Sequence, residues 1–237
     1  MREPAILLSS DHVVVADKPA GMLTIPGRRG AADPRPCLVH EVARRFSGKV
    51  WIVHRLDLEV SGLVVFARSA EAHRLLCGLF ERRGVVKRYE AWTAGEPPGE
   101  AGFEAAWEGL LVRGKRRSWE SDRGKPGRTV ARYLGATAWR SIALLRWEMR
   151  PETGRSHQIR CQAATRGFPV AGDRLYGSTV EFLPGAIALR ASGLEFRDAR
   201  DAELERLGLP RRVEAAPAAE AWGEKAAGPT AARRSRA

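Results

Sequence analysis

The chain has 237 residues, of which 44% are hydrophobic and 29% are charged. This length and balance fit one soluble globular domain and exclude a wholly disordered chain. No stretch approaches the roughly 20 apolar residues that a membrane-spanning helix needs. The N-terminal sequence turns polar too early for a signal peptide, so the sequence predicts a cytoplasmic protein.

The charge favours a polyanionic partner. Lysine and arginine together number 40 against 28 acidic residues, a formal net charge of +12. Such an excess is typical of nucleic-acid-binding proteins, because neutralised phosphates release counterions. From residue 211 the composition shifts to alanine and arginine, which predicts a folded domain over 1–210 and a mobile tail over 211–237.

The apolar patterns predict a mixed α and β chain. Alternation and short apolar runs predict strands over 5–8, 13–16, 51–57, 62–68, 85–95, 103–107, from Thr129 and over 141–150, with closing strands at 187–189 and 194–196. Helical spacing predicts helices over 38–46, 70–83 and 156–165.

Several common catalytic motifs are missing. The sequence has no phosphate-binding GxxxxGK[ST], no GxGxxG after a strand, no GxSxG and no HExxH. Its five histidines are scattered, and its three cysteines have no CxxC spacing. We therefore expect neither a metal nor a disulfide framework.

Two segments carry polar groups where a purely structural segment would carry apolar ones. The first is His54-Arg55-Leu56-Asp57, in which an aspartate at a turn can project into a cleft beside positive charge. The second, residues 153–160 (TGRSHQIR), opens a helix whose N-terminus attracts anions. The alternatives are a turn-forming aspartate paired with arginine and a solvated first helical turn.

Four segments resemble the RluA-type pseudouridine synthases. They are DKPAGML (17–23), HRLDLEVSGLVVFAR (54–68), VVKRYEAWTAG (85–95) and TGRSHQIRCQAATRGFPVAGDRLYG (153–177). They occur in the order that this family has, and the resemblance covers about residues 5–200. The resemblance implies an α+β catalytic domain with a long, bent, mainly antiparallel sheet, flanking helices and a central cleft. It also implies isomerisation of uridine to pseudouridine in structured RNA, rRNA or tRNA, without cofactor or metal. Because DKPAGML begins only about sixteen residues into the sequence, we expect no additional N-terminal RNA-binding module.

The resemblance also implies the site residues. Asp57 matches the family's essential aspartate, and a carboxylate can attack a sugar as a nucleophile or act there as a base. Arg160 matches the arginine that pairs with this aspartate. Tyr89 matches the tyrosine that packs on the target base and is also a candidate to remove the C5 proton. Leu189 matches a leucine beneath the base.

Other residues are assigned to RNA. Arg55 resembles the family residue near the flipped nucleotide, which has to leave its stack to reach Asp57. Arg155 is expected to contact phosphate or to order the motif loop. His54, which is also a candidate RNA contact, and His157 are expected either to orient neighbouring groups or to be buried, hydrogen-bonded structural residues.

The segment 113–128 is strongly basic. Lys115, Arg116 and Arg117 precede Trp119, a pattern that suits a phosphate-binding loop with one stacking platform. A solvated insertion is the alternative. The arginine-bearing loop over 26–36 permits the same two interpretations.

Two other functions were weighed against the synthase. A catalytically silent RNA-binding or ribosome-assembly factor would be favoured by loss of the aspartate, the tyrosine or the arginine, but all three are present. A glycosidase needs two carboxylates across the scissile bond, and Glu59, the one acid near Asp57, would share its face. The sequence predicts a monomer whose partner is RNA, with neither membrane nor metal.

Overall fold

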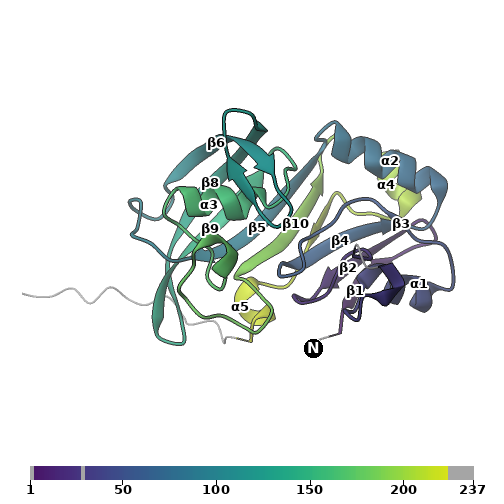
Figure 1. Cartoon of the computed structure of the whole chain (residues 1–237). Helices are drawn as coiled ribbons and strands as arrows, with labels where there is room; N and C mark the ends of the chain where they lie inside the picture. Colours follow the sequence, from purple (N-terminus) through teal and green to yellow (C-terminus); the bar gives the residue numbers. More distant parts are fainter. Residues whose placement is uncertain (1–2, 28–29, 224–237) are drawn as a thin grey trace, which may run out of the picture.

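The computed structural model describes residues 3–27 and 30–223. These residues form one 11-stranded sheet in the order β1-β2-β4-β10-β5-β9-β8-β6-β7, with β11 paired to β10 and β3 paired to β4 (Figure 1). The strands are β1 (Ala5–Ser9), β2 (Val13–Lys18), β3 (Trp51–Ile52), β4 (Ser61–Ala67), β5 (Val85–Thr93), β6 (Glu104–Arg113), β7 (Ser118–Glu120), β8 (Lys125–Trp139), β9 (Ile142–Pro151), β10 (Leu189–Phe196) and β11 (Arg212–Glu214).

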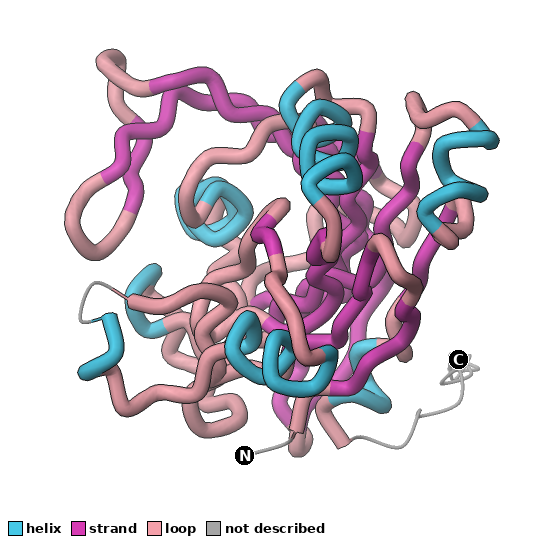
Figure 2. The backbone as a smooth tube through the Cα atoms, turned by 90° about the vertical axis from the view of Figure 1, so that its right-hand side faces the viewer, coloured by secondary structure: helices cyan, strands magenta, loops and turns pink. Residues whose placement is uncertain are grey.

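The helices lie around the strands, as Figure 2 shows. They are α1 (Leu38–Phe46), α2 (Ala70–Glu81), α3 (Gln158–Thr165), α4 (Asp201–Leu207) and α5 (Ala218–Ala221), with short 3-10 turns at Gly30–Ala32 and Arg174–Tyr176. The predicted helix over 38–46 is confirmed at both ends. α2 begins after Ser69, whose hydroxyl accepts a hydrogen bond from the Ala72 amide, the usual N-cap arrangement.

Both faces of the sheet are covered near β4, because every residue of that strand is buried. One face packs with α2 and α4, through residues such as Leu63, Leu76 and Leu204. The other face packs with α1. A strand buried on both sides needs an almost continuous apolar run, and SGLVVFA supplies one.

Among the described strands, β4 and β10 form the one parallel pair, and Gly62 permits their contact. Gly62 has a φ of +111°, and a Cβ there would lie 2.2 Å from the Ala191 carbonyl oxygen. Only glycine therefore fits where β10 passes the start of β4. This pairing fixes β10 beside the segment that precedes β4.

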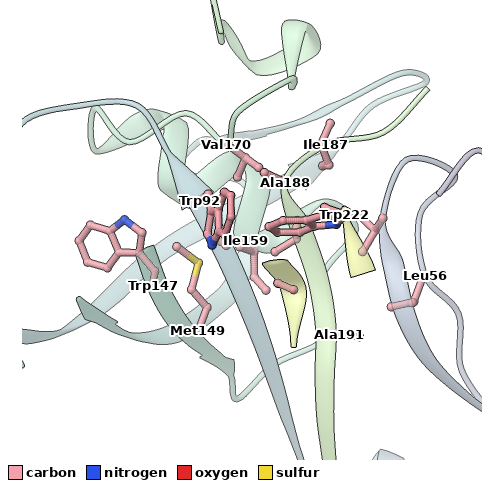
Figure 3. Close-up of a cluster of buried hydrophobic side chains, with 14 of the residues drawn as sticks. Leu56, Trp92, Trp147, Met149, Ile159, Val170, Ile187, Ala188, Ala191 and Trp222 are labelled. Carbon is pink, nitrogen blue, oxygen red and sulfur yellow. The ribbon is translucent and has the colours of Figure 1, made fainter. Parts of the chain in front are cut away.

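The C-terminal boundary predicted from composition is wrong. Residues 212–214 form β11 on β10, and Ala218 and Trp222 are buried. Figure 3 shows Trp222 within the aromatic core, and its ring centroid lies 4.8 Å from that of Trp92. The segment was misjudged because its one large apolar side chain packs against residues distant in sequence. The remainder of the predicted tail, 224–237, lies outside the described residues.

Several predicted elements have different limits in the structure. The strand over 51–57 covers only Trp51–Ile52, because the backbone of Leu56 bonds to the Thr24 hydroxyl, not to a strand. The strands at 187–189 and 194–196 are parts of one strand, β10, with an irregularity between Ala191 and Gly193. β6 runs on to residue 113, and β7 lies within the predicted basic loop.

No helix in the described part of the chain is long and apolar enough to cross a membrane.

Candidate active site

A cleft of about 1280 Å³ opens over the middle of the sheet. Its walls come from the loop before β4, from β5, from the start of β10 and from the segment 150–160. Asp57, Tyr89, Arg160 and Leu189, which lie far apart in sequence, all line it. The fold therefore brings the four predicted central residues to one place.

Asp57 is held by a buried arginine. Its carboxylate lies 3.3 Å from Nη1 of Arg160, and the Asp57 side chain is 23% exposed whereas that of Arg160 is 2% exposed. The carboxylate therefore meets the cleft on one side and a fixed positive charge on the other. A guanidinium in this position stabilises and orients the ionised carboxylate.

Arg160 is itself positioned by Asp173, which the sequence analysis did not assign to the site. Nε and Nη2 of Arg160 donate to the two carboxylate oxygens of Asp173 at 2.7 and 2.9 Å. Burial lowers the pKa of Arg160, but the hydrogen bonds and the charge of Asp173 outweigh it and raise the pKa overall. The available signal was the Gly-Asp pair within the fourth matching segment.

Glu59 also contacts Nη1 of Arg160, at 3.2 Å. Its carboxylate therefore sits on the same guanidinium as that of Asp57. Two acids on one cation do not flank a sugar from opposite sides, so this geometry does not suit the glycosidase alternative.

Tyr89 and Leu189 form an apolar part of the cleft wall. Burial raises the pKa of Tyr89, and the charge of Asp57 raises it further, so the phenol is protonated at neutral pH. Leu189 is buried and pairs with Ala91, two residues along β5 from Tyr89. The two side chains offer a surface for a flat ring beside the Asp57 carboxylate.

His157 has a φ of 51°, in the left-handed region, so α3 begins only at Gln158 and not at 156 as predicted. Its Nε2 lies 3.7 Å from the Asp57 carboxylate, and its Nδ1 lies 3.2 Å from the Tyr176 hydroxyl. Burial lowers the pKa of His157 although Asp57 opposes this. Tyr176 in turn accepts a hydrogen bond from the Ser118 amide at 2.8 Å, which ties β7 to the site.

Buried amides secure the segment before α3. The side-chain oxygen Oε1 of Gln158 accepts from the Thr153 hydroxyl at 2.6 Å and from the Arg155 backbone amide at 3.1 Å. Its amide nitrogen donates to the Arg128 carbonyl at 3.0 Å and to the Thr129 hydroxyl at 2.9 Å. The Thr-Gly-Arg turn is therefore fixed against β8.

A buried lysine secures the other side of the Asp57 loop. Lys18 donates to the carbonyls of Pro19, Met22 and Leu58 at 3.0, 2.8 and 3.3 Å. Burial lowers its pKa to about 7, while nearby carboxylates, Asp57 first, act in the opposite direction. Sequence reasoning found the DKPAG segment but assigned no role to this lysine.

The residues predicted to bind RNA separate into two groups. Arg55, Arg155 and the basic residues at 115–117 line the cleft, and all but Arg155 are exposed. Arg155 is half-buried, and its Nε donates to the Pro126 carbonyl at 3.0 Å. Of the loop over 26–36, Arg35 lines the cleft, and residues 28–29 lie outside the described residues.

His54 differs from the other predicted RNA contacts. It stacks on Phe80 with ring centroids 4.6 Å apart, and its Nε2 accepts a hydrogen bond from the Val65 amide. Burial lowers its pKa to about 3. This geometry is that of a neutral structural histidine between α2 and β4.

No group of three or more His, Cys, Asp or Glu side chains suited to a metal ion occurs in the described ranges 3–27 and 30–223. The expected absence of a metal stays a prediction.

Known proteins match this sequence over most of its length. The family described as RNA pseudouridylate synthase matches residues 12–165. The dual-specificity RNA pseudouridine synthase RluA of Escherichia coli (strain K12) is 32% identical over 184 residues, 73% of this chain and 77% of that protein. The ribosomal large subunit pseudouridine synthase D of Zymomonas mobilis is 32% identical over 178 residues, 73% of this chain. The matched part is 55% of that second protein, so the chain spans little more than half of its length.

The fold has matches among solved structures as well. Human RNA Pseudouridylate Synthase Domain Containing 1 superposes with a TM-score of 0.68 at 22% identity, covering 86% of each chain. Human RNA Pseudouridylate Synthase Domain Containing 4 gives a TM-score of 0.60 at 21% identity, covering 80% of this chain and 82% of that one. The predicted α+β fold with a large, mainly antiparallel sheet is confirmed. The chain belongs to the RNA pseudouridylate synthase family, as the resemblance of its motifs to the RluA-type enzymes predicts.

Proposed function

We propose that the protein isomerises specific uridines in structured RNA to pseudouridine. The observation that carries this proposal is the Asp57 carboxylate, which is partly exposed in the cleft and held by the buried Arg160. Family membership supports an RNA-modifying enzyme over a silent RNA-binding factor, with RNA as the partner.

The reaction breaks the N1–C1′ bond, turns the uracil and forms a C5–C1′ bond, while C5 loses a proton and N1 gains one. Asp57 attacks C1′ as a nucleophile or removes the C2′ proton as a base, and each role requires an ionised carboxylate. Arg160 supplies the charge that stabilises this form. All groups in this scheme come from the chain and the RNA, so we expect no cofactor.

Tyr89 and Leu189 are proposed to pack against the target base. Stacking of a nucleobase on an aromatic ring contributes about 1–3 kcal/mol. The protonated phenol of Tyr89 has no hydrogen-bond partner among the described residues, so its hydroxyl is free to meet the substrate. Tyr89→Phe keeps the ring and removes the hydroxyl, and we expect it to keep RNA binding and to lose release of the C5 hydrogen.

Arg55, Arg155 and the basic residues at 115–117 are proposed to hold the RNA. They line the same cleft as Asp57, and Arg55 is exposed there. A uridine that has left its stack needs a side chain to fill or hold open the gap, and Arg55 suits that role. His54 is better explained as a structural residue, because its Nε2 already accepts a backbone hydrogen bond.

The experiment is release of tritium from C5-tritiated uridine in transcripts of tRNA and large-subunit rRNA. Formation of the C5–C1′ bond expels that hydrogen, so the assay follows the chemistry directly. We expect release by the wild type and none by Asp57→Asn. Glu59→Gln is the matched control, because it removes a second carboxylate from the same guanidinium and should retain release.

Release by both wild type and Asp57→Asn would refute the assignment of Asp57. Tight RNA binding without release by the wild type would favour the silent factor. Mapping the product identifies the modified uridine. Monomeric state and cytoplasmic location are part of the same proposal, and sedimentation and cell fractionation test them.

A further inference from the structure

Lys87 lies in the cleft wall on β5, two residues before Tyr89. Alternate residues of a strand point to the same side of the sheet, so both side chains face the cleft. Lys87 is half-buried, and its ammonium makes one hydrogen bond, to the Thr153 carbonyl at 3.3 Å. An ammonium carries three N–H groups, so two of them have no acceptor among the described residues.

The charge of Lys87 has no counter-charge in the described part of the chain. No carboxylate there forms an ion pair with it, and the charged group that acts on it most is Arg83, which has the same sign. Burial, reinforced by Arg83, lowers the pKa of Lys87. A half-buried cation without a partner is costly, so the fold gains nothing from keeping this lysine for its own stability.

Other buried or half-buried cations of the fold have more partners than Lys87: the ammonium of Lys18 donates to three carbonyls, and two arginines pair with carboxylates. Arg190, which is buried, pairs with Asp17 at 2.6 Å. Arg88, the next residue on β5, pairs with Glu195 at 2.8 Å on the opposite face of the sheet. Lys87 differs from these residues in that its open N–H groups face a cleft, where an anion from outside the chain can reach them.

We propose that Lys87 binds a phosphate flanking the target uridine once that nucleotide has turned into the cleft. This proposal rests on the proposed function, because it takes the Asp57 site as the place where the base lies. The strand separates Lys87 from Tyr89 by about 6.6 Å along its axis. A base packed on Tyr89 and a phosphate at Lys87 would be joined by one ribose. The Thr153 carbonyl holds the ammonium in the wall between binding events.

The test replaces single phosphates by neutral methylphosphonates, 5′ or 3′ of the target uridine, in an RNA stem-loop that the wild type modifies. We expect the wild type to lose roughly 10–100-fold in kcat/KM at one of these two positions, the factor for one charge-assisted hydrogen bond. Lys87→Gln keeps a donor toward Thr153. On RNA with ordinary phosphates its kcat/KM should already be lower than that of the wild type by this factor, and the neutral linkage should not lower it further. Lys87→Arg should keep the sensitivity of the wild type.

Arg88→Gln is the matched control, since it changes the neighbouring cation on the opposite face of β5. It should retain the sensitivity of the wild type at the same phosphate. Equal sensitivity of Lys87→Gln and wild type at both positions overturns the proposal. The proposal is also overturned if neither neutral linkage lowers the kcat/KM of the wild type. This second outcome needs no variant, so the test holds even if Lys87→Gln does not fold.

Failure of the proposed function has a different signature, namely that the wild type releases no C5 hydrogen from any RNA. In that case the same comparison is made on RNA-binding affinity, with the neutral linkage moved through each loop position. A position where the wild type loses affinity and Lys87→Gln does not supports the phosphate contact. Absence of such a position overturns it.

Discussion

Replacement of Asp173 by asparagine tests how the site arginine is held. Asp173 is 1% exposed and Arg160 is 2% exposed, and two hydrogen bonds join them. Asp173→Asn removes the negative charge and one acceptor but leaves the guanidinium buried. Removing one partner of a buried ion pair costs about 3–5 kcal/mol. Asp57 and Glu59 still contact Arg160, so we expect the lower end, about 3 kcal/mol, or a fall in Tm of roughly 6–12 °C.

Urea denaturation at neutral pH measures this loss, and tritium release measures its effect on the site. We expect kcat to fall more than KM rises, because a displaced Arg160 no longer orients the Asp57 carboxylate. The control is Glu181→Gln, which breaks the ion pair between Glu181 and Arg174. In this pair the Glu181 side chain is 82% exposed and the Arg174 side chain is 78% exposed. That exposed pair should contribute less than about 1 kcal/mol. A loss below about 1 kcal/mol for Asp173→Asn, or equal losses in both variants, would refute the reasoning.

Three further predictions concern the rest of the domain. His54 has a pKa of about 3 in the fold against an ordinary 6.5, so its neutral form stabilises the protein above pH 6.5 and that stability is lost as pH falls. In urea denaturation, the free energy of unfolding of the wild type should exceed that of His54→Asn by about 2–3 kcal/mol less at pH 4.5 than at pH 7.5. A difference that stays constant between these pH values would contradict the prediction. Trp222→Ala should lower the free energy of unfolding by about 3–5 kcal/mol, because the Trp222 ring is buried against the aromatic core. Trp119 is 45% exposed, so Trp119→Ala should lower that free energy by less than about 1 kcal/mol. Replacing the three basic residues at 115–117 by alanine should make the negative slope of log K against log salt concentration for RNA binding shallower by about 2. An unchanged slope would show that this loop makes no phosphate contacts.

Elements that depend on local sequence were predicted well: the helix over 38–46 and the apolar stripe of α2 follow from periodicity. The motifs single out Asp57, Tyr89 and Arg160, and the fold brings these three residues to one cleft, while their roles stay predictions. The need for glycine at position 62 is explained only by the fold, since the backbone contact that excludes a Cβ there is made with β10, far along the chain.

Residues that act through a distant partner were missed or misplaced. The Gly-Asp pair of the fourth matching segment marks Asp173 in the sequence, but its pairing with Arg160 is visible only in the fold, and Trp222 stands alone in an alanine-rich segment until the core is assembled. For His54 the sequence left an RNA contact and a structural role open. Its stacking on Phe80 reflects the packing of α2 over β4.

The sequence by itself determined the family, the segments that form the cleft and the identity of the central carboxylate. These depend on short motifs, whose residue types and spacing can be read along the chain before the fold is known. Only the tertiary structure decided which charges are paired and which are left open. Burial and distance control the cost of a charge, and both arise when segments such as 54–59, 85–89 and 153–160 come together. For that reason the pairing of Arg160 with Asp173, and the open ammonium of Lys87, became visible only in the fold.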